Sequence, residues 1–250
     1  MSRFCGGRQE IAREAAAGER EGMLLQHREG LGRLRVVLAS GSPRRRELLG
    51  GLGLEPEVVP SRFAEDLGPG NFAGGAAYAQ ETAVRKALEV AGRDAVTGGL
   101  GAGGAADLII GGDTVVESPA GAVLEKPADA EDAARMLREL SGDVHRVHTG
   151  VALVLPQATD PRTGRAPLVR AFAETTEVKF AELEEALVQA YVASGDPMDK
   201  AGAYGIQGPA GSFVRGIRGC YSNVVGLPLH RVTSEIKGLL DAGLLVPPRE

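Results

Sequence analysis

The sequence predicts an α/β protein built around a mixed, twisted sheet. Segments with helical periodicity alternate with strand-like runs along the 250 residues, which is the pattern of α/β folds. A hydrophobic content of 43% with 24% charged residues is typical of a globular protein with a sizeable core. No apolar run approaches the ~20 residues of a membrane span, so we expect no membrane partner.

The first core segment predicts a strand, a turn and the start of a helix. Residues 35–39 form a short β-branched run suited to a buried strand, and Ser40 and Gly41 supply the turn. Ser42 is a good N-cap and Pro43 suits the first helical position. A helix N-terminus is therefore expected directly after a buried strand.

Three arginines follow at positions 44–46, in the first turn of this helix, where the helix dipole disfavours cations. Backbone N–H groups at such a site already attract anions, and Arg44 and Arg45 add guanidinium donors. A phosphate-type ligand between these groups would remove the repulsion. The alternative is an ordinary strand–helix junction with a solvated basic turn.

The next segments predict a strand, a loop, a helix and an insertion. Residues 57–59 form the strand, and the loop after it carries Glu65 and Asp66. Residues 92–106 are rich in Gly and Ala without periodicity, which indicates a flexible insertion that carries no chemistry. Between them, residues 76–91 are rich in helix formers, and one face should be buried: Ala79, Ala83, Val84, Ala87 and Leu88.

Residues 107–127 predict two strands joined by a type I turn over Ser118–Gly121. If that turn closes a hairpin, the residue numbers of facing pairs sum to 239, which places Asp113 opposite Lys126 and Val116 opposite Val123. Asp113 also follows an apolar run and two glycines. Its carboxylate is therefore expected at the end of a buried strand, where the backbone can approach a ligand closely. The alternative is that Asp113 and Lys126 form only an ion pair.

The second half of the chain continues the alternation. Asp129 is expected to cap a helix that Gly142 ends, with a buried stripe of Ala133, Met136, Leu137 and Leu140. The remaining predicted elements are a strand at 144–155, a loop at 156–167, a strand at 168–180, a helix at 181–195, a glycine-dense loop with short strands, and a helix around 229–240.

Composition also bears on compartment and partners. Residues 1–33 lack the apolar core of a secretory signal and carry more acids than a transit peptide usually does, which predicts a flexible extension. Cys5 and Cys220 are too few for a disulfide framework, so we expect a reduced, cytoplasmic protein. The net charge of −5 argues against a nucleic-acid partner.

Basic residues recur at the ends of predicted strands and the starts of helices, at Arg44, Arg45, Lys86, Lys126 and Lys200. They outnumber the plausible structural partners in their own segments. A basic cluster with one or two carboxylates is the chemistry of a metal–polyphosphate site, in which cations neutralise phosphate oxygens and carboxylates hold Mg²⁺ or orient water. Taken alone, Lys86 is a solvated helix lysine. The four histidines show no metal-ligand or general-base pattern.

Seven ordered segments carry a resemblance to a known family: LASGSPRRRELL, GGDTVV, LEKP, MLRELSG, VHTGVALV, GDPMDKAGAYGIQG and NVVGLPL. Through them, residues 34–240 resemble the Maf family of nucleoside triphosphate pyrophosphatases, and the eukaryotic branch in particular. The resemblance implies a single domain over residues 34–245 with a two-lobed, cleft-containing fold related to inosine triphosphate pyrophosphatases.

The resemblance also implies the reaction and its participants. A nucleoside triphosphate is cleaved between the α- and β-phosphates to a monophosphate and pyrophosphate, with Mg²⁺ or Mn²⁺ as cofactor. Such an activity would remove noncanonical nucleotides before they are incorporated. A homodimer is compatible with the resemblance, although no single stretch of sequence proves one.

The acidic site residues follow from the same resemblance. Asp113 in GDT resembles the family's catalytic proton acceptor or metal ligand, and both roles stay open. Glu65 resembles a metal-side carboxylate, with its neighbour Asp66 as the alternative in a loose motif.

The basic and polar site residues are assigned in the same way. Lys86 and Lys126 resemble the lysines that neutralise phosphate charge during catalysis, and Ser40 and Arg45 resemble the phosphate-binding loop. Substrate choice in the family follows three further positions, and these are Arg44, Thr114 and Gln207 in this sequence.

That trio resembles the subgroup acting on dTTP and UTP, including modified pyrimidines, and disfavours the subgroup associated with 7-methyl-GTP. A glutamine amide could read a pyrimidine edge through one donor and one acceptor. Two other interpretations compete with the enzyme: a protein that binds nucleotides without hydrolysis, and a division-linked regulatory protein acting through protein contacts.

Overall fold

A computed structural model describes residues 24–93, 96 and 104–248, and its centre is a seven-stranded sheet with the order β2-β1-β3-β5-β6-β7, in which β4 pairs with β3. β1 runs parallel to β2 and β3, and the other pairs are antiparallel, so the predicted mixed sheet is confirmed. The strands are β1 (Val36–Leu38), β2 (Glu57–Val58), β3 (Leu108–Glu117), β4 (Val123–Leu124), β5 (Val144–Leu155), β6 (Leu168–Phe180) and β7 (Val214–Arg218).

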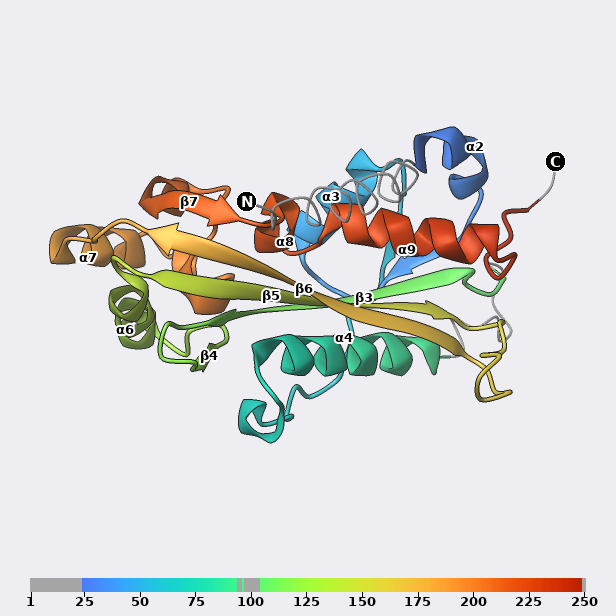
Figure 1. The fold of residues 1–250 in the computed structure, drawn as a ribbon, viewed down its shortest axis with the longest axis horizontal. Coiled ribbons are helices and arrows are strands. Elements are labelled where there is room, and N and C mark those ends of the chain that lie inside the picture. Colours follow the sequence, from blue (N-terminus) through green and yellow to red (C-terminus); the bar gives the residue numbers. More distant parts are fainter. Residues whose placement is uncertain (1–23, 94–95, 97–103, 249–250) are drawn as a thin grey trace, which may run out of the picture.

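Helices cover both faces of this sheet, with α4 on one face and α3, α8 and α9 on the other (Figure 1). The helices are α2 (Arg28–Leu31), α3 (Pro43–Gly51), α4 (Gly75–Ala91), α6 (Ala130–Leu140), α7 (Glu185–Ala193), α8 (Tyr221–Val225) and α9 (Leu229–Asp241). The 3-10 turns are η1 (Leu24–His27), η2 (Pro69–Asn71), η3 (Asp196–Asp199), η4 (Ala201–Ala203) and η5 (Pro209–Phe213). Within the described ranges, no helix is long and apolar enough to cross a bilayer.

Small residues bring α4 unusually close to the sheet. A Cβ added at Gly111 of β3 would lie 2.4 Å from the Ala83 carbonyl oxygen, and one at Gly150 of β5 would lie 2.1 Å from that of Ala79. Only glycine leaves room for this approach. Of the face predicted to be buried, the three alanines are fully buried, whereas Leu88 is 36% exposed because it turns away from the strands.

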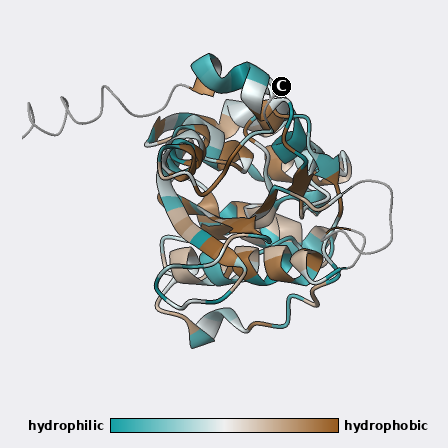
Figure 2. Ribbon diagram, turned by 90° about the vertical axis from the view of Figure 1, so that its right-hand side faces the viewer, coloured by the Kyte–Doolittle hydropathy of each residue, from teal (hydrophilic) through white to brown (hydrophobic). Residues whose placement is uncertain are grey.

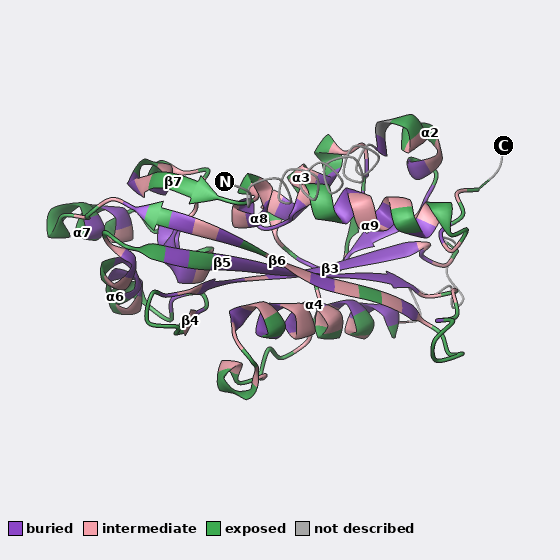
Figure 3. Cartoon of the chain, in the orientation of Figure 1, coloured by how far each residue is buried: buried purple, intermediate pink, exposed green. Residues whose placement is uncertain are grey.

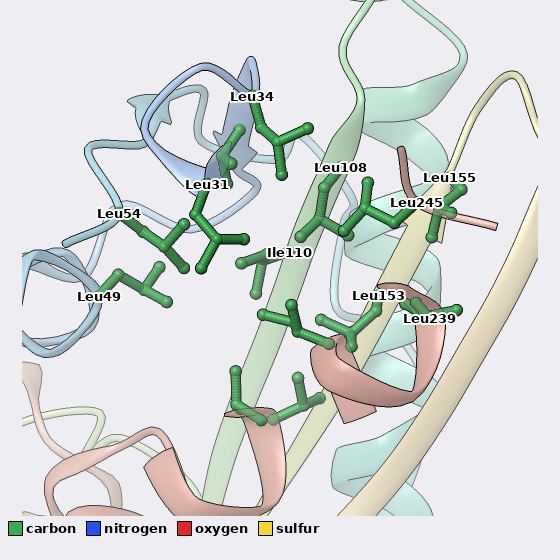
Figure 4. Close-up of a cluster of buried hydrophobic side chains, with 14 of the residues drawn as sticks. Leu31, Leu34, Leu49, Leu54, Leu108, Ile110, Leu153, Leu155, Leu239 and Leu245 are labelled. Carbon is green, nitrogen blue, oxygen red and sulfur yellow. The ribbon is translucent and has the colours of Figure 1, made fainter. Parts of the chain in front are cut away.

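Hydrophobic residues gather along the strands between the helical layers (Figure 2), and β3 and the middle of β5 are almost entirely buried (Figure 3). One leucine-rich cluster joins β1, β3 and β5 to α3 and α9 (Figure 4). Leu24 and Leu31 belong to this cluster and are 3% and 1% exposed. Of the extension expected over residues 1–33, residues 24–31 therefore form the helical turns η1 and α2, and two of their leucines are buried in the core; residues 1–23 lie outside the described residues.

The hairpin between β3 and β4 has a different register from the predicted one. Its turn has the expected hydrogen bond from Gly121 N to Ser118 O, at 2.9 Å, but Gly121 adopts φ +85° and adds a residue to the loop. Facing pairs therefore sum to 240, and Val116 lies opposite Leu124. Asp113 lies beyond this short ladder and faces Gly150 of β5, so its predicted pairing with Lys126 is wrong.

Several local predictions are confirmed. Asp129 caps α6 by accepting a hydrogen bond from Asp132 N at 2.8 Å, and the predicted stripe of that helix is buried. Pro43 begins α3 after Ser42, although the Ser42 side chain makes no capping hydrogen bond. In the predicted insertion, residues 94–95 and 97–103 lie outside the described residues, whereas Val96 and Ala106 are buried in the core.

An aromatic cluster at one end of the sheet encloses a histidine of β5. The ring of His145 packs edge-on against Phe180 with centroids 4.7 Å apart, and its Nε2 lies 2.8 Å from the Tyr204 hydroxyl oxygen. Burial lowers the pKa of His145 to about 4 because the apolar surroundings disfavour the charged ring, and the nearby Asp143 opposes this only in part.

We expect this histidine to make stability depend on pH. The unfolded chain binds a proton at His145 near pH 6.5 and the folded chain only near pH 4, so the free energy of unfolding falls as pH falls through that window, by up to about 3 kcal/mol. Urea unfolding of wild type and His145→Gln between pH 8 and 4 measures it, with the exposed His230→Gln as control. Equal pH dependence in wild type and His145→Gln would contradict the assignment.

Candidate active site

One large cavity of about 930 Å³ opens between the β1–α3 turn, the middle of β3, the segment after β4, the η3–η4 region and α8. All nine residues that the sequence analysis selected line it: Ser40, Arg44, Arg45, Glu65, Lys86, Asp113, Thr114, Lys126 and Gln207. The fold thus brings together positions that are spread over 168 residues of sequence, from Ser40 to Gln207. Their individual roles stay predictions.

Arg45 is a buried cation of the cavity that is held by three hydrogen bonds. Its Nε donates to the Gly226 carbonyl oxygen at 2.9 Å, Nη1 to Ser40 Oγ at 2.8 Å and Nη2 to Thr114 Oγ1 at 2.9 Å. All three acceptors are neutral, and within the described part of the chain no carboxylate pairs with this side chain. The solvated basic turn considered for Arg45 is therefore wrong, because the guanidinium is buried and held in one orientation.

Burial lowers the pKa of Arg45, and the negative charge of Asp113 works against that shift. Glycine at position 112 makes the burial sterically feasible, because a Cβ there would lie 2.9 Å from Arg45 Nε. A guanidinium whose acceptors are neutral keeps its positive charge available to an anionic ligand.

A directed hydrogen-bond chain supports Thr114 from behind. The Thr149 hydroxyl donates to the Asn223 carbonyl oxygen at 2.9 Å, so the 3.0 Å contact between Thr114 and Thr149 has Thr114 as donor. Asn223 is fully buried and its amide donates to Val147 O at 3.0 Å. The sequence analysis missed this support; polar residues inside the apolar segments VHTGVALV and NVVGLPL were its signal.

Lys86 joins two of the predicted carboxylates. Its Nζ lies 2.7 Å from Asp113 Oδ1 and 2.8 Å from Glu65 Oε2, and only 12% of the Lys86 side chain is exposed. Lys86 is therefore not a solvated helix lysine. Glu65 adopts φ +50°, a strained value for a non-glycine residue that marks many functional loops.

Two further cations are paired across the cavity. Arg44 Nη1 lies 3.3 Å from Asp199 Oδ2, while Lys200 Nζ lies 2.7 Å from Asp199 Oδ1 and 3.1 Å from Asp196 Oδ1. By contrast, Lys126 and Gln207 are exposed and make no hydrogen bond or ion pair within the residues that the structure describes.

The expectation that basic residues outnumber their partners is therefore wrong. Five cationic and five carboxylate side chains line the cavity. Asp196 and Asp199 were overlooked although both lie within four residues of Lys200, and Asp199 also pairs with Arg44, 155 residues away in sequence. Glu125 was overlooked as well, and it lines the cavity beside Lys126.

The carboxylates can be tested for fit to a divalent cation. Oxygens of Glu65 and Asp113 both approach one nitrogen atom within 2.8 Å, so two carboxylates already converge on a single cation. No group of three or more His, Cys, Asp or Glu residues that could hold a metal occurs among the described residues. This donor set fits Mg²⁺ of the kind held by one or two carboxylates together with substrate phosphates, rather than by an all-protein cage.

Fold and cavity together define an α/β protein with a mixed sheet and one large, polar, charge-balanced cavity beside a strand–turn–helix junction. Residues 35–239 match the family described as Maf-like protein, so the chain belongs to that family. The predicted membership is thereby confirmed.

Two relatives and one solved structure illustrate the similarity. A Homo sapiens "Probable bifunctional dTTP/UTP pyrophosphatase/methyltransferase protein" is 48% identical over 86% of this chain, which spans 33% of that relative. A Thermococcus onnurineus "dTTP/UTP pyrophosphatase" is 46% identical over 79% of this chain and 94% of its own length. The Staphylococcus aureus Ham1 structure aligns over 84% of this chain and 99% of its own, at 12% identity and a TM-score of 0.41.

We expect Arg45→Lys to lower the free energy of unfolding of the protein. A lysine keeps the charge but cannot reach the three oxygens that the guanidinium fork serves, so the free energy of unfolding should fall by about 1–3 kcal/mol. Urea unfolding measures the loss. Arg46→Lys, an exposed neighbour on the same helix, is the control and should be neutral; equal stability of both variants would contradict the anchoring role of Arg45.

Proposed function

We propose that this protein is a nucleoside triphosphate pyrophosphatase that hydrolyses dTTP and UTP to the monophosphate and pyrophosphate. One observation carries the proposal: the buried, neutrally bonded Arg45 guanidinium shares a cavity with the Glu65–Lys86–Asp113 cluster. Relatives named as dTTP/UTP pyrophosphatases, 44–46% identical over most of their own length, support the same chemistry. The implied role is the removal of noncanonical nucleotides.

A divalent cation belongs to this proposal because of the charges in the cavity. Its five cations and five carboxylates cancel, so the protein alone does not compensate a highly anionic triphosphate. Asp113 and Glu65 would hold Mg²⁺ or Mn²⁺ together with phosphate oxygens. When bound, the ion neutralises charge and polarises the reacting phosphate.

The remaining groups bind and orient the substrate. Arg45, with Ser40 and the free N–H groups at the start of α3, faces the phosphates from one side. Lys126 has no hydrogen-bond or ion-pair partner among the described residues, so its ammonium group is available to bind the leaving pyrophosphate. There it would stabilise the developing negative charge. Lys86 exchanges part of its contact with Asp113 and Glu65 for phosphate contact.

Base selection is assigned to Gln207, Arg44 and Thr114. Gln207 presents an amide without a described hydrogen bond, and one donor with one acceptor matches a uracil or thymine edge. Arg44 is available once the substrate replaces its exposed contact with Asp199. Thr114 acts on selectivity through Arg45, because its hydroxyl is already bonded to that guanidinium.

The decisive experiment measures pyrophosphate release with Mg²⁺ or Mn²⁺ from dTTP, UTP, CTP, GTP, 5-methyl-UTP, pseudo-UTP and 7-methyl-GTP. We expect turnover of dTTP and UTP and a loss of roughly 100-fold or more in kcat for Asp113→Asn. The exposed Asp66→Asn, one residue from Glu65 but outside the cavity lining, is the control. Nucleotide binding without turnover in the wild type would replace the enzyme with a binding protein.

A further inference from the structure

Glu125 differs from every other carboxylate that lines the cavity. Glu65 and Asp113 are paired with Lys86, and Asp196 and Asp199 are paired with Lys200. Glu125 has no cationic partner in the part of the chain that the structure describes; its one side-chain contact there is the Tyr78 hydroxyl, which donates to Oε1 at 2.7 Å. Its second carboxylate oxygen makes no hydrogen bond to described residues.

Tyr78 is built as a fixed donor. The side chain is 1% exposed, packs edge-on against Phe72 with ring centroids 5.5 Å apart, and lies two turns before Lys86 on α4. Burial, the hydrogen bond to Glu125 and the charge of Asp113 all raise the pKa of Tyr78, so the hydroxyl stays protonated. Glu125 lines the same cavity as Asp113.

Glu125 is exposed to the cavity, and its backbone is bonded to the η4 turn. Its carbonyl oxygen accepts a hydrogen bond from Gly202 N at 3.0 Å. Gly202 itself has φ +64°, and a Cβ there would lie 2.7 Å from Val116 Cγ2, so the η4 turn is locked against β3. Glu125 is therefore a preorganised carboxylate with one oxygen oriented by Tyr78 and the other available to a ligand.

An available carboxylate in a site that binds a polyphosphate needs a proton donor or a cation between it and the phosphates, because two anions repel each other. Glu65 and Asp113 already converge on a cation, which suits them to the metal side. A carboxylate that no cation neutralises is better suited to accept a proton from water.

Resting on the proposed function, we propose that Glu125 is a further catalytic residue, which binds the attacking water and accepts its proton, with Tyr78 as its positioning residue. The water oxygen forms a bond to the α-phosphorus while the bond from the α-phosphorus to the oxygen bridging to the β-phosphate breaks. Pyrophosphate leaves with that electron pair, and the water proton passes to Glu125 and then to solvent. Asp113 is left to the cation.

Glu125→Gln tests the proton acceptor. The amide keeps the shape and can still accept from Tyr78, but it is not basic, so kcat should fall roughly 100-fold or more with KM within about 3-fold of wild type. Mn²⁺ binding, followed by the electron paramagnetic resonance signal of free Mn²⁺, should be unchanged. Glu131→Gln, an exposed change on α6, is the control.

Three outcomes of this experiment oppose the proposal in different ways. A kcat within about 3-fold of wild type means that Glu125 does not serve the reaction. Loss of Mn²⁺ binding together with kcat makes Glu125 a cation ligand instead. Absence of turnover in the wild type overturns the proposed function and the role of Glu125 with it, whereas wild-type turnover with an active Glu125→Gln overturns only the latter.

Tyr78→Phe provides a second test, which distinguishes a tyrosine that positions Glu125 from one that serves only in packing. The ring and its packing on Phe72 remain, but the Glu125 carboxylate loses the hydrogen bond that orients it, so kcat should fall roughly 10-fold with KM within about 3-fold of wild type. Tyr191→Phe is a matched control, since its hydroxyl donates to the cavity carboxylate Asp196 at 2.5 Å. An unchanged kcat in Tyr78→Phe, or an equal fall in both variants, would overturn the proposal.

Discussion

The burial of one positive charge organises the cavity of this protein. A guanidinium removed from water is stable only if its donors are satisfied, and Arg45 meets this requirement with oxygens from the nearby turn after β1 and from two distant segments, the middle of β3 and the residue after α8. The side chain therefore holds these segments together. Because the acceptors are neutral, structural anchoring leaves the charge available to an anionic ligand.

Close packing of α4 against the sheet positions the cavity residues that this helix carries. Alanines of α4 lie against glycines of β3 and β5, which sets the height and rotation of this helix above the sheet. The same helix carries Tyr78 and Lys86, so the packing that fixes its position also fixes the Tyr78–Glu125 and Lys86–Asp113 contacts. The packing of the core and the geometry of the candidate site therefore depend on the same helix–sheet contacts, and a larger residue at Gly111 or Gly150 would disturb both.

Charge balance gives the cavity its chemical character. Four of its five carboxylates are paired with cations, which removes most of the repulsion that a cluster of buried like charges would create. Under the proposed function, an anionic substrate would meet a neutral site and not a basic one, which is compatible with a substrate that brings its own divalent cation. Among the described residues, Glu125 is the cavity carboxylate without a cationic partner.

Local interactions explain how much the sequence by itself determined. The alternation of helices and strands, the Asp129 cap and the helix start at Pro43 depend on neighbouring residues and could be predicted. The nine residues that line one cavity were selected through the resemblance of short motifs to a family. The tertiary structure decided the rest. The left-handed conformation of Gly121 shifted the hairpin register within its own turn. Burial of two leucines placed residues 24–33 against the core, Lys86 found its partners in Asp113 and Glu65, and Arg44 found its partner in Asp199. The last three outcomes depend on contacts between segments far apart in the chain, whose geometry no local pattern encodes.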